Sequence, residues 1–252
     1  MLSAVHRHVP LVFPAGRYKV LHTVDIDYAD AADVGLEVQG NGAIIDGTAI
    51  PFEGDTMIMW VHCSGGTPQA PKACFYFHLA GTLHVYANRP HGWAVWFGNL
   101  DLSDAHNSMK VDHLDVNNAA YDAGGTFLGY VFNADLDIIS NGGDRNFAFW
   151  IQQLQFSVLK GAAGTPSGWG IFWGTEGGYN ISNTIEGFGF EPGAWCSVNT
   201  NSKTQHNTFV SPYFNCAHAV FSIPGETDVL VNPLFAGDVQ DKGRLDGFQI
   251  LP

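Results

Sequence analysis

The sequence predicts an all-β protein, a single-stranded right-handed parallel β-helix in which the chain winds through successive coils. Three observations predict this fold class. Helical periodicity is scarce, and short apolar runs rich in aromatic and β-branched residues are instead closed by Gly, Asn, Asp or Pro. The closures recur at an irregular interval of ~19–24 residues, as in a solenoid. The 30 glycines supply turns, and the 14% of charged residues is too few for a long solvated helical bundle.

The strand-like runs extend along most of the chain and predict one domain, 1–252. An N-terminal entry coil (1–50) is followed by central coils (51–237) and a C-terminal tail (238–252). The clearest runs are Val9–Phe13, Met57–Val61, Trp93–Phe97, Phe127–Phe132, Phe147–Ile151, Gly170–Trp173 and Ala219–Ile223. Each run has the length of one short β-strand, so successive runs are assigned to successive coils.

Amide side chains close several of these runs, and they suggest a polar ladder. Asn99, Asn133, Gln152 and Asn199 follow the apolar runs at comparable places. Equivalent positions of stacked coils lie ~4.8 Å apart, and Asn accepts the left-handed backbone geometry of a tight corner. Two interpretations stay open: amides that bond to one another along the stack, or ordinary loop residues.

The charge balance excludes some partners. The 24 acidic and 11 basic residues give a net charge of −13. Binding to nucleic acid or to an anionic membrane needs clustered Lys and Arg, so neither is expected. No apolar run reaches the ~18 residues of a membrane span, and the N-terminus shows no signal-peptide pattern. We expect an extracellular or virion-associated protein that leaves the cell by another route, such as lysis.

The cysteines and the known motifs give little chemistry. Cys63, Cys74, Cys196 and Cys216 form no C-x-x-C pair and are interpreted as buried free thiols, with a Cys63–Cys74 disulfide as the alternative. Phosphate-loop, zinc-helix and nucleophile-elbow motifs do not occur in the sequence. We therefore expect neither a cofactor nor a metal site.

Two N-terminal segments resemble the opening of the pectate-lyase-like superfamily. Phe13–Tyr18 (FPAGRY) matches the pattern hydrophobic-Pro-Ala-Gly-x-Tyr, and 40–47 (GNGAIIDG) matches Gly-x-Gly-x-x-Ile-x-Gly. The signature covers about 35 residues and says more about fold than about function. The resemblance implies a bacteriophage-tailspike or polysaccharide-processing type of β-helix and a homotrimer. The family usually has a segment before the Pro-Ala-Gly turn, so we expect a fragment or a chain capped by partner chains.

Aromatic residues supply candidates for sugar contact. The chain has 18 Phe, 8 Tyr and 7 Trp, and coils ~5 Å apart would align outward rings in a groove. Strand alternation predicts that Trp93 and Val95 share one face while Ala94 and Trp96 share the other, so about half of the aromatics are expected in the core. The candidate substrate-binding residues are Trp93, Trp96, Tyr130, Trp150, Trp169, Trp173 and Arg145.

Carboxylates in the middle coils supply candidates for catalysis. Inverting glycoside hydrolysis uses two carboxyl groups ~6.5–9.5 Å apart. Asp135 and Glu176 occupy comparable corners about two coils apart, and Asp144 lies in a loop between them in the sequence. Asp135, Asp144 and Glu176 are therefore the candidate catalytic residues. Solvated turn acids are the alternative interpretation.

These observations favour a polysaccharide-binding and -cleaving protein, a glycoside hydrolase-like depolymerase with a carboxylate pair in an aromatic-lined groove. A non-catalytic structural or adhesive trimeric β-helix module is an alternative that the short chain favours. A polysaccharide lyase is a further alternative, with Lys110, His113 and Arg145 near Asp112 and Asp115. It is less favoured because the chain has few basic residues to neutralise a uronate.

Overall fold

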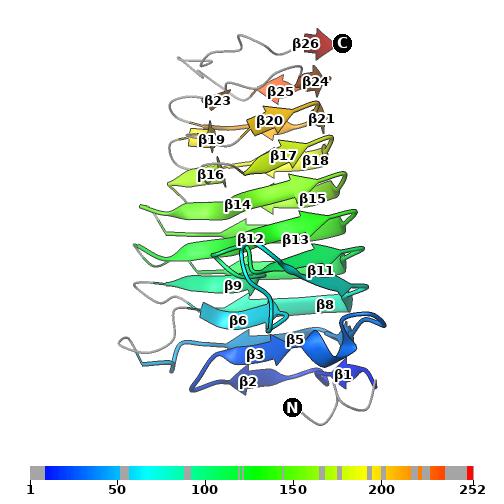
Figure 1. Ribbon diagram of the computed structural model, residues 1–252. Coiled ribbons are helices and arrows are strands. Elements are labelled where there is room, and N and C mark those ends of the chain that lie inside the picture. Colours follow the sequence, from blue (N-terminus) through cyan, green and yellow to red (C-terminus); the bar gives the residue numbers. More distant parts are fainter. Residues whose placement is uncertain are drawn as a thin grey trace.

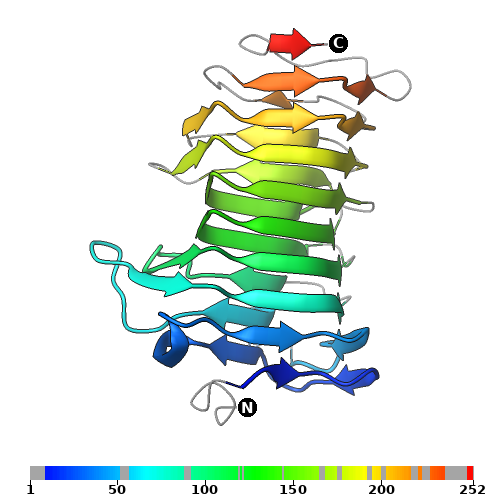
Figure 2. The same ribbon diagram turned by 90° about the vertical axis from the view of Figure 1, so that its right-hand side faces the viewer.

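The computed structural model describes residues 9–51, 57–87, 92–118, 120, 122–143, 145–164, 168–174, 178–191, 195–199, 203–216, 221–222, 228–235 and 249–251. These residues form an all-β parallel β-helix, which confirms the predicted fold class. The coils stack from the N-terminal end to the C-terminal end (Figures 1 and 2). One 3-10 turn, η1 (Ala29–Ala31), is the only helical segment among the described residues.

Two long sheets run along the stack. Sheet A has 14 strands: β1 (Leu11–Val12), β2 (Arg17–Lys19), β4 (Glu37–Gln39), β5 (Ala43–Asp46), β8 (His78–Tyr86), β11 (Lys110–Asn117), β13 (Asp135–Asn141), β15 (Val158–Ala163), β18 (Thr184–Phe190), β21 (Thr208–Val210), β22 (Tyr213–Phe214), β24 (Val229–Val231), β25 (Leu234–Phe235) and β26 (Gln249–Leu251). Sheet B has 12: β3 (Val24–Asp27), β6 (Met57–His62), β7 (Lys72–Phe75), β9 (Trp93–Phe97), β10 (Asp104–Asn107), β12 (Gly124–Phe132), β14 (Phe147–Gln155), β16 (Trp169–Trp173), β17 (Tyr179–Ile181), β19 (Trp195–Asn199), β20 (Lys203–Gln205) and β23 (Phe221–Ser222).

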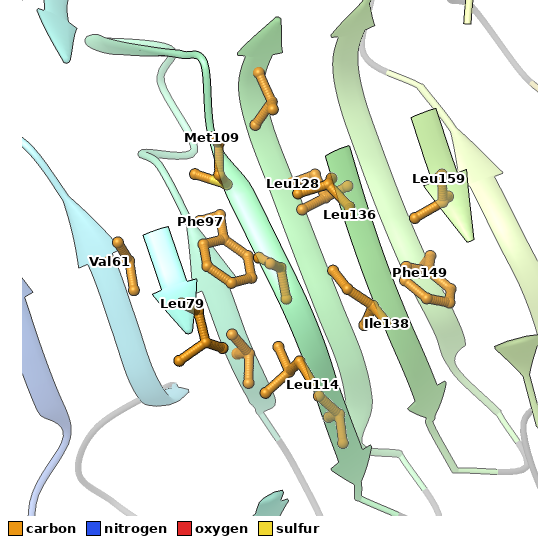
Figure 3. Packing of buried hydrophobic residues seen from close by; sticks show 14 of the residues in the cluster. Val61, Leu79, Phe97, Met109, Leu114, Leu128, Leu136, Ile138, Phe149 and Leu159 are labelled. Atoms are coloured by element: carbon orange, nitrogen blue, oxygen red, sulfur yellow. The ribbon is translucent and has the colours of Figure 1, made fainter. Parts of the chain in front are cut away.

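The pairing register stacks equivalent residues of successive coils. Figure 3 shows buried side chains from several neighbouring coils packed together in the interior. In sheet A the inward row is Val38, Leu79, Val111, Leu136, Leu159, Ile185, Phe209 and Leu230. In sheet B it is Ile26, Val61, Phe97, Leu128, Ile151 and Trp173. One continuous core cluster results, from Phe13 to Leu230, and the burial of apolar area along it stabilises every coil.

The two segments that carry the family resemblance lie side by side in the first coils. β2 pairs with β5, and Arg17 Nε donates to Asp46 Oδ2 at 2.7 Å. Gly42 has a φ of 71°, which favours glycine, and a Cβ at Gly40 would collide with the carbonyl oxygen of Thr82. The glycines of this motif therefore serve a tight turn and a close approach between coils.

A residue with left-handed backbone geometry turns the chain from sheet B into sheet A in successive coils. These residues are Tyr76, Ser108, Asn133, Phe156, Ser182 and His206, with φ between 51° and 58°. They recur about every 25 residues, slightly more than the interval that the sequence predicts. Only Asn133 of the four expected ladder amides lies at this corner, and its Nδ2 donates to Asn107 Oδ1 at 3.0 Å.

The main polar ladder lies one residue beyond this corner. Asn183 donates from its backbone N and from Nδ2 to Asn207 Oδ1, at 3.1 and 2.9 Å. Asn207 donates in the same way to Asp228 Oδ1, at 2.8 and 3.1 Å. The expectation that Gln152 belongs to the ladder is wrong, because its Nε2 donates instead to the backbone oxygen of Leu100. Backbone geometry alone therefore does not locate the stacked amides.

The cysteines form two disulfides, Cys63–Cys74 and Cys196–Cys216, so their interpretation as free thiols is wrong. All four are buried, as expected. The Cα atoms are 6.5 Å apart in the first pair and 5.7 Å apart in the second. The solenoid brings each pair together although 11 and 20 positions separate them in sequence.

The C-terminal region continues the stack. β26 (Gln249–Leu251), which the sequence assigned to a tail, pairs with β24 in the same parallel register as the earlier coils.

Asp228 accepts the last hydrogen bonds of this ladder and is buried. The carboxyl is 1% exposed, and its Oδ2 has no hydrogen-bond partner in the described structure. Burial raises the pKa of Asp228 to about 6, although the hydrogen bonds from Asn207 act in the opposite direction. The protonated carboxyl therefore suits this site better than the ionised one.

Replacing Asp228 by Asn is expected to stabilise the fold by about 2 kcal/mol near neutral pH. A carboxyl with a raised folded pKa favours the native state while it is protonated, and this contribution is lost as the pH rises from 3.8 toward about 6. The Asn side chain keeps an oxygen that can accept the hydrogen bonds from Asn207, and it carries no charge. Urea unfolding across this pH range should show a flatter profile for Asp228→Asn, whereas the exposed control Asp33→Asn should follow the parent protein. Parallel profiles for Asp228→Asn and the parent would contradict the prediction.

Candidate functional site

Several aromatic residues of sheet B lie on its outer face, where burial does not alternate strictly along the strands. In β9, Ala94 and Val95 are adjacent and both fully buried, while Trp93 and Trp96 on either side are partly exposed. β16 has the same pattern of burial. The expectation of strict alternation is therefore wrong in β9: Ala94 and Val95 both belong to the core, and both indoles are partly exposed.

Register then aligns outward rings of successive coils. This aromatic row consists of Trp60, Trp96, Phe127, Trp150 and Phe172. Ring centroids are 4.6 Å apart from Trp96 to Phe127, 5.3 Å from Phe127 to Trp150 and 6.0 Å from Trp150 to Phe172. Phe127 is fully buried against its neighbours, so the exposed surface of the row comes from the partly exposed rings of Trp60, Trp96, Trp150 and Phe172.

The candidate sugar contacts occupy different environments. Trp93, Trp96, Trp150 and Trp169 are partly exposed on sheet B, and Tyr130 is partly exposed beside Phe132. Arg145 is exposed in the turn before β14. The expectation for Trp173 is wrong: its side chain is 1% exposed, because its register beside Ile151 directs it into the core.

Of the candidate catalytic carboxylates, the structure describes Asp135, which is not brought together with these aromatics. Asp135 lies on sheet A, where its exposed carboxylate accepts a hydrogen bond from Lys160 Nζ at 3.2 Å. The aromatic row lies on sheet B. Asp144 and Glu176 lie outside the described residues.

The outer face of sheet A carries the residues considered for lyase chemistry except Arg145, and they form ion pairs within β11 and with neighbouring strands. Lys110 Nζ is 2.8 Å from Asp112 Oδ1, and the pKa of Asp112 is held well below its usual range, first by Lys110 and then by the Gly81 amide. His113 contacts Asp137 Oδ2 at 3.4 Å. Asp115 contacts His84 on the neighbouring strand β8.

A groove with a volume of 890 Å³ lies at the end of the aromatic row. It is formed by β3, β6 and β9 together with the loop that follows β9. The lining residues are His22, Thr23, Asp25, Met57, Trp60, His62, Ser64, Gly65, Trp96, Asn99, Leu100, Asp101 and Ser103. The groove thus combines two indoles with two carboxylates, and it is the candidate functional site.

A stacked pair of rings forms one side of the groove. The Trp60 indole lies 3.7 Å from the His62 imidazole, at 15° between the planes. Trp60 Nε1 donates to the backbone oxygen of Gly98 at 3.1 Å, which fixes the indole. His62 Nε2 is 2.8 Å from Asp25 Oδ1, and the exposed fractions of the two side chains are 8% and 56%. Asp25 is therefore accessible from the groove, while His62 is held behind it.

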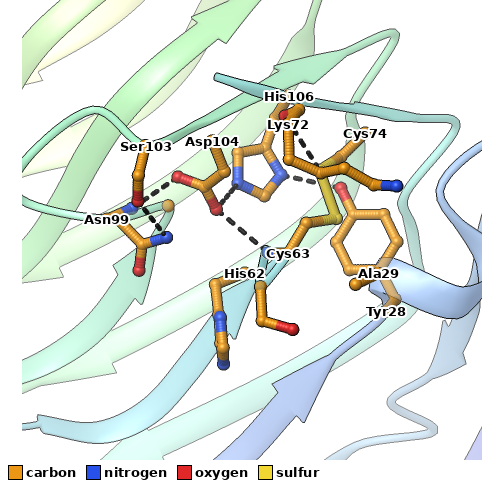
Figure 4. Close-up of polar contacts among 12 residues, drawn as sticks. Tyr28, Ala29, His62, Cys63, Lys72, Cys74, Asn99, Ser103, Asp104 and His106 are labelled. Atoms are coloured by element: carbon orange, nitrogen blue, oxygen red, sulfur yellow. Dashed lines mark hydrogen bonds and ion pairs between the residues drawn. A yellow bond between two sulfur atoms is a disulfide. The ribbon is translucent and has the colours of Figure 1, made fainter. Parts of the chain in front are cut away.

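The opposite side of the groove is the loop after β9, which a buried polar network holds in place (Figure 4). Asp104 Oδ1 accepts a hydrogen bond from the backbone N–H of Asn99 at 2.7 Å, and Asp104 Oδ2 accepts one from the backbone N–H of Cys63 at 3.0 Å. His106 Nε2 is 3.0 Å from Asp104 Oδ2, and its Nδ1 is 2.7 Å from the Tyr28 hydroxyl. This network connects three coils beneath the groove.

The network contains a buried ionised carboxylate. Asp104 and His106 are both 0% exposed. Burial raises the pKa of Asp104, but hydrogen bonds from His106, Cys63 and Asn99 and the charge of His106 outweigh burial and hold the pKa below its ordinary value. Burial, followed by the charge of Asp104, raises the pKa of Tyr28 well above its ordinary value. Tyr28 therefore stays protonated, and its hydroxyl keeps the hydrogen bond to His106 Nδ1.

Sequence reasoning missed Asp25, Trp60, His62 and Asp101 as site residues. Trp60 lies in a recognised apolar run, Met57–Val61, and its register beside Trp96 was the signal that could have found it. Asp25 and Asp101 come from different coils. Their proximity to one groove depends on the fold and has no signature in the sequence.

Comparisons with protein-family models, curated proteins and solved structures found no match to this chain. The described residues contain no cluster of three or more His, Cys, Asp or Glu side chains arranged to hold a metal ion. Within the same residues, none of the helical structure has the length and hydropathy needed to cross a bilayer.

Replacing Asp104 by Asn is expected to destabilise the fold by about 3 kcal/mol, because it breaks a buried charged pair and leaves His106 without its anionic partner. The lowered folded pKa means that Asp104 stabilises the protein above the ordinary Asp pKa, and that this stabilisation is lost as the pH falls through the lowered value. Urea unfolding near neutral pH measures the loss. Asp33→Asn, at an exposed turn, should change the free energy of unfolding by less than about 0.5 kcal/mol. Equal effects of the two substitutions would contradict this role for Asp104.

Proposed function

We propose that this protein binds and cleaves a polysaccharide, as a glycoside hydrolase-like depolymerase of the pectate-lyase-like, tailspike type. The observation that carries the proposal is that Trp60, Trp96, Asp25 and Asp101 line one groove of 890 Å³. The family assignment depends on the two N-terminal segments alone, since no family model matches the chain.

The groove offers both elements that glycan chemistry needs. A sugar ring presents an apolar C–H face, and partly exposed indoles such as Trp60 and Trp96 provide flat surfaces for it. Hydrolysis needs one carboxyl group to protonate the leaving oxygen and a second to act as base or nucleophile. Asp101 Oδ1 accepts a hydrogen bond from the backbone amide of Ser103, and Asp25 Oδ1 lies 2.8 Å from His62 Nε2. We assign the two carboxyl roles to Asp25 and Asp101 as a pair.

A non-catalytic structural or adhesive module is the second candidate. It is supported by the length of the aromatic row, which continues from the groove along β12, β14 and β16, away from Asp25 and Asp101. The row would bind glycan without cleaving it or pack against partner chains. A homotrimer, as the family resemblance implies, remains part of the proposal.

An extracellular or virion-associated location is also proposed. Disulfides persist in oxidising compartments and are rare in the cytosol. The Cys63–Cys74 and Cys196–Cys216 bonds therefore support a protein that functions outside the reducing interior of a cell.

Trp60→Ala and Trp96→Ala are each expected to weaken binding of the cognate polysaccharide by about tenfold, since each removes an aromatic contact of about 1–2 kcal/mol. Tyr179→Ala removes an exposed ring on β17, outside the groove, and should leave binding unchanged. Affinity electrophoresis in gels that contain single polysaccharides from a broad panel measures the shift. Equal retardation of all four proteins would contradict a glycan site in this groove.

Cleavage is tested on the same panel by following new reducing ends together with the ultraviolet absorbance of unsaturated products. Hydrolysis predicts reducing ends without absorbance, and Asp25→Asn or Asp101→Asn should then lower kcat at least about a hundredfold. Both signals together would indicate a lyase. Binding without either signal would favour the non-catalytic module.

A further inference from the structure

The charge of the groove indicates which polysaccharides it accepts. We infer that the groove selects a positively charged glycan, an amino-sugar polymer with free rather than acetylated amines, over neutral and uronate-containing glycans. This inference rests on the proposed function, in which the groove binds a glycan. It deepens that function by naming the substrate class.

The residues that line the groove include negatively charged carboxylates but no positively charged Lys or Arg among the described residues. Its described residues include Asp25 and Asp101 but neither Lys nor Arg. Asp25 is 56% exposed and contacts His62, while Asp101 is exposed and accepts a hydrogen bond from the uncharged amide of Ser103. A cationic ligand would therefore meet accessible carboxylates in this groove.

The outer face of sheet A provides the contrast within the same molecule. There, Lys110 Nζ lies 2.8 Å from Asp112, and Lys160 Nζ lies 3.2 Å from Asp135. These carboxylates already have cationic partners from the chain. The carboxylates of the groove are thus distinguished by their partners and not by exposure alone.

The aromatic side chains of the groove act in the same direction as its carboxylates. The face of an indole attracts cations through its quadrupole, and quaternary ammonium groups bind well between aromatic rings. Trp60 and Trp96 are neighbours in register and both line the groove. A sugar that stacks on one indole would therefore place an amine substituent near the other indole and near the carboxylates.

An anionic sugar would encounter the opposite situation. A uronate would approach a protein of net charge −13, at a groove whose described lining has carboxylates and no Lys or Arg. The lining also includes His22 and His62. Selection should therefore be measured at about pH 8, well above the ordinary pKa of histidine, with a ligand that keeps its positive charge there.

The experiment compares four tetramers by calorimetry at about pH 8, where histidine is neutral. They are a glucosamine tetramer with trimethylated amines, which is permanently cationic, the N-acetylated tetramer, a galacturonate tetramer and tetralysine. The trimethylated tetramer is expected to bind at least about tenfold more tightly than the acetylated one at about 20 mM salt, and this preference should shrink at about 300 mM salt because the charges are screened.

The variants separate charge from folding. Asp101→Asn is expected to weaken binding of the trimethylated tetramer about fivefold and to leave the acetylated tetramer within twofold, as one screened charge contact would. Asp25→Asn should act similarly, and Asp101→Asn keeps the test valid if loss of the His62 contact disturbs the fold. The matched control Asp135→Asn, on sheet A, should change neither affinity.

The outcomes distinguish this inference from the proposed function. If the acetylated or galacturonate tetramer binds as tightly as the trimethylated one, the charge selection is wrong and glycan binding stands. If tetralysine matches the trimethylated tetramer, the groove recognises cationic peptide and the inference fails. If no sugar tetramer binds, both the inference and the proposed function fail.

Discussion

The parallel register between successive coils is the constraint on which the rest of the structure depends. Backbone hydrogen bonds between parallel strands hold equivalent residues at a fixed spacing of about 4.8 Å. A residue that is buried in one coil is therefore stacked on the equivalent residue of the next, as in the row through Leu79, Val111 and Leu136. The same register makes a ladder of Asn183, Asn207 and Asp228 at a corner and a strip of rings on the outer face of sheet B. Core, corner and surface share one geometric cause.

The groove depends on this register and on the buried polar network around Asp104 that lies beneath it. Trp60 and Trp96 are brought together by pairing of β6 with β9, and the facing loop is held by hydrogen bonds to the buried carboxylate of Asp104. His106 and Tyr28 extend this support to other coils, so the loop has a fixed position although its outer side chains are exposed. A rigid wall of this kind reduces the ordering cost of binding a long flexible ligand.

The sequence predicted the fold well and the site poorly, for identifiable reasons. Short apolar runs with turn residues are a local signal, and Met57–Val61 and Trp93–Phe97 both contribute strands. Strict alternation failed at Ala94 and Val95, where two consecutive residues are buried and the local sequence carries no signal for it. The disulfide partners Cys196 and Cys216, and the groove residues Asp25 and Asp101, meet only through the winding of the coils. Contacts of this kind depend on the exact number of residues in each coil. That number is hard to read from the sequence because the loops differ in length.

The groove lies between three strands that pair directly, β3, β6 and β9, in a structure where each coil pairs with its immediate neighbours. Each coil can consequently change on its own. Its outward residues can differ, or its loop can lengthen, while the inward row of buried residues keeps the stack intact. Outward and inward residues of the same strands are therefore separable. Under the proposed function, the surface that contacts a glycan could change coil by coil while the stacked core stays intact.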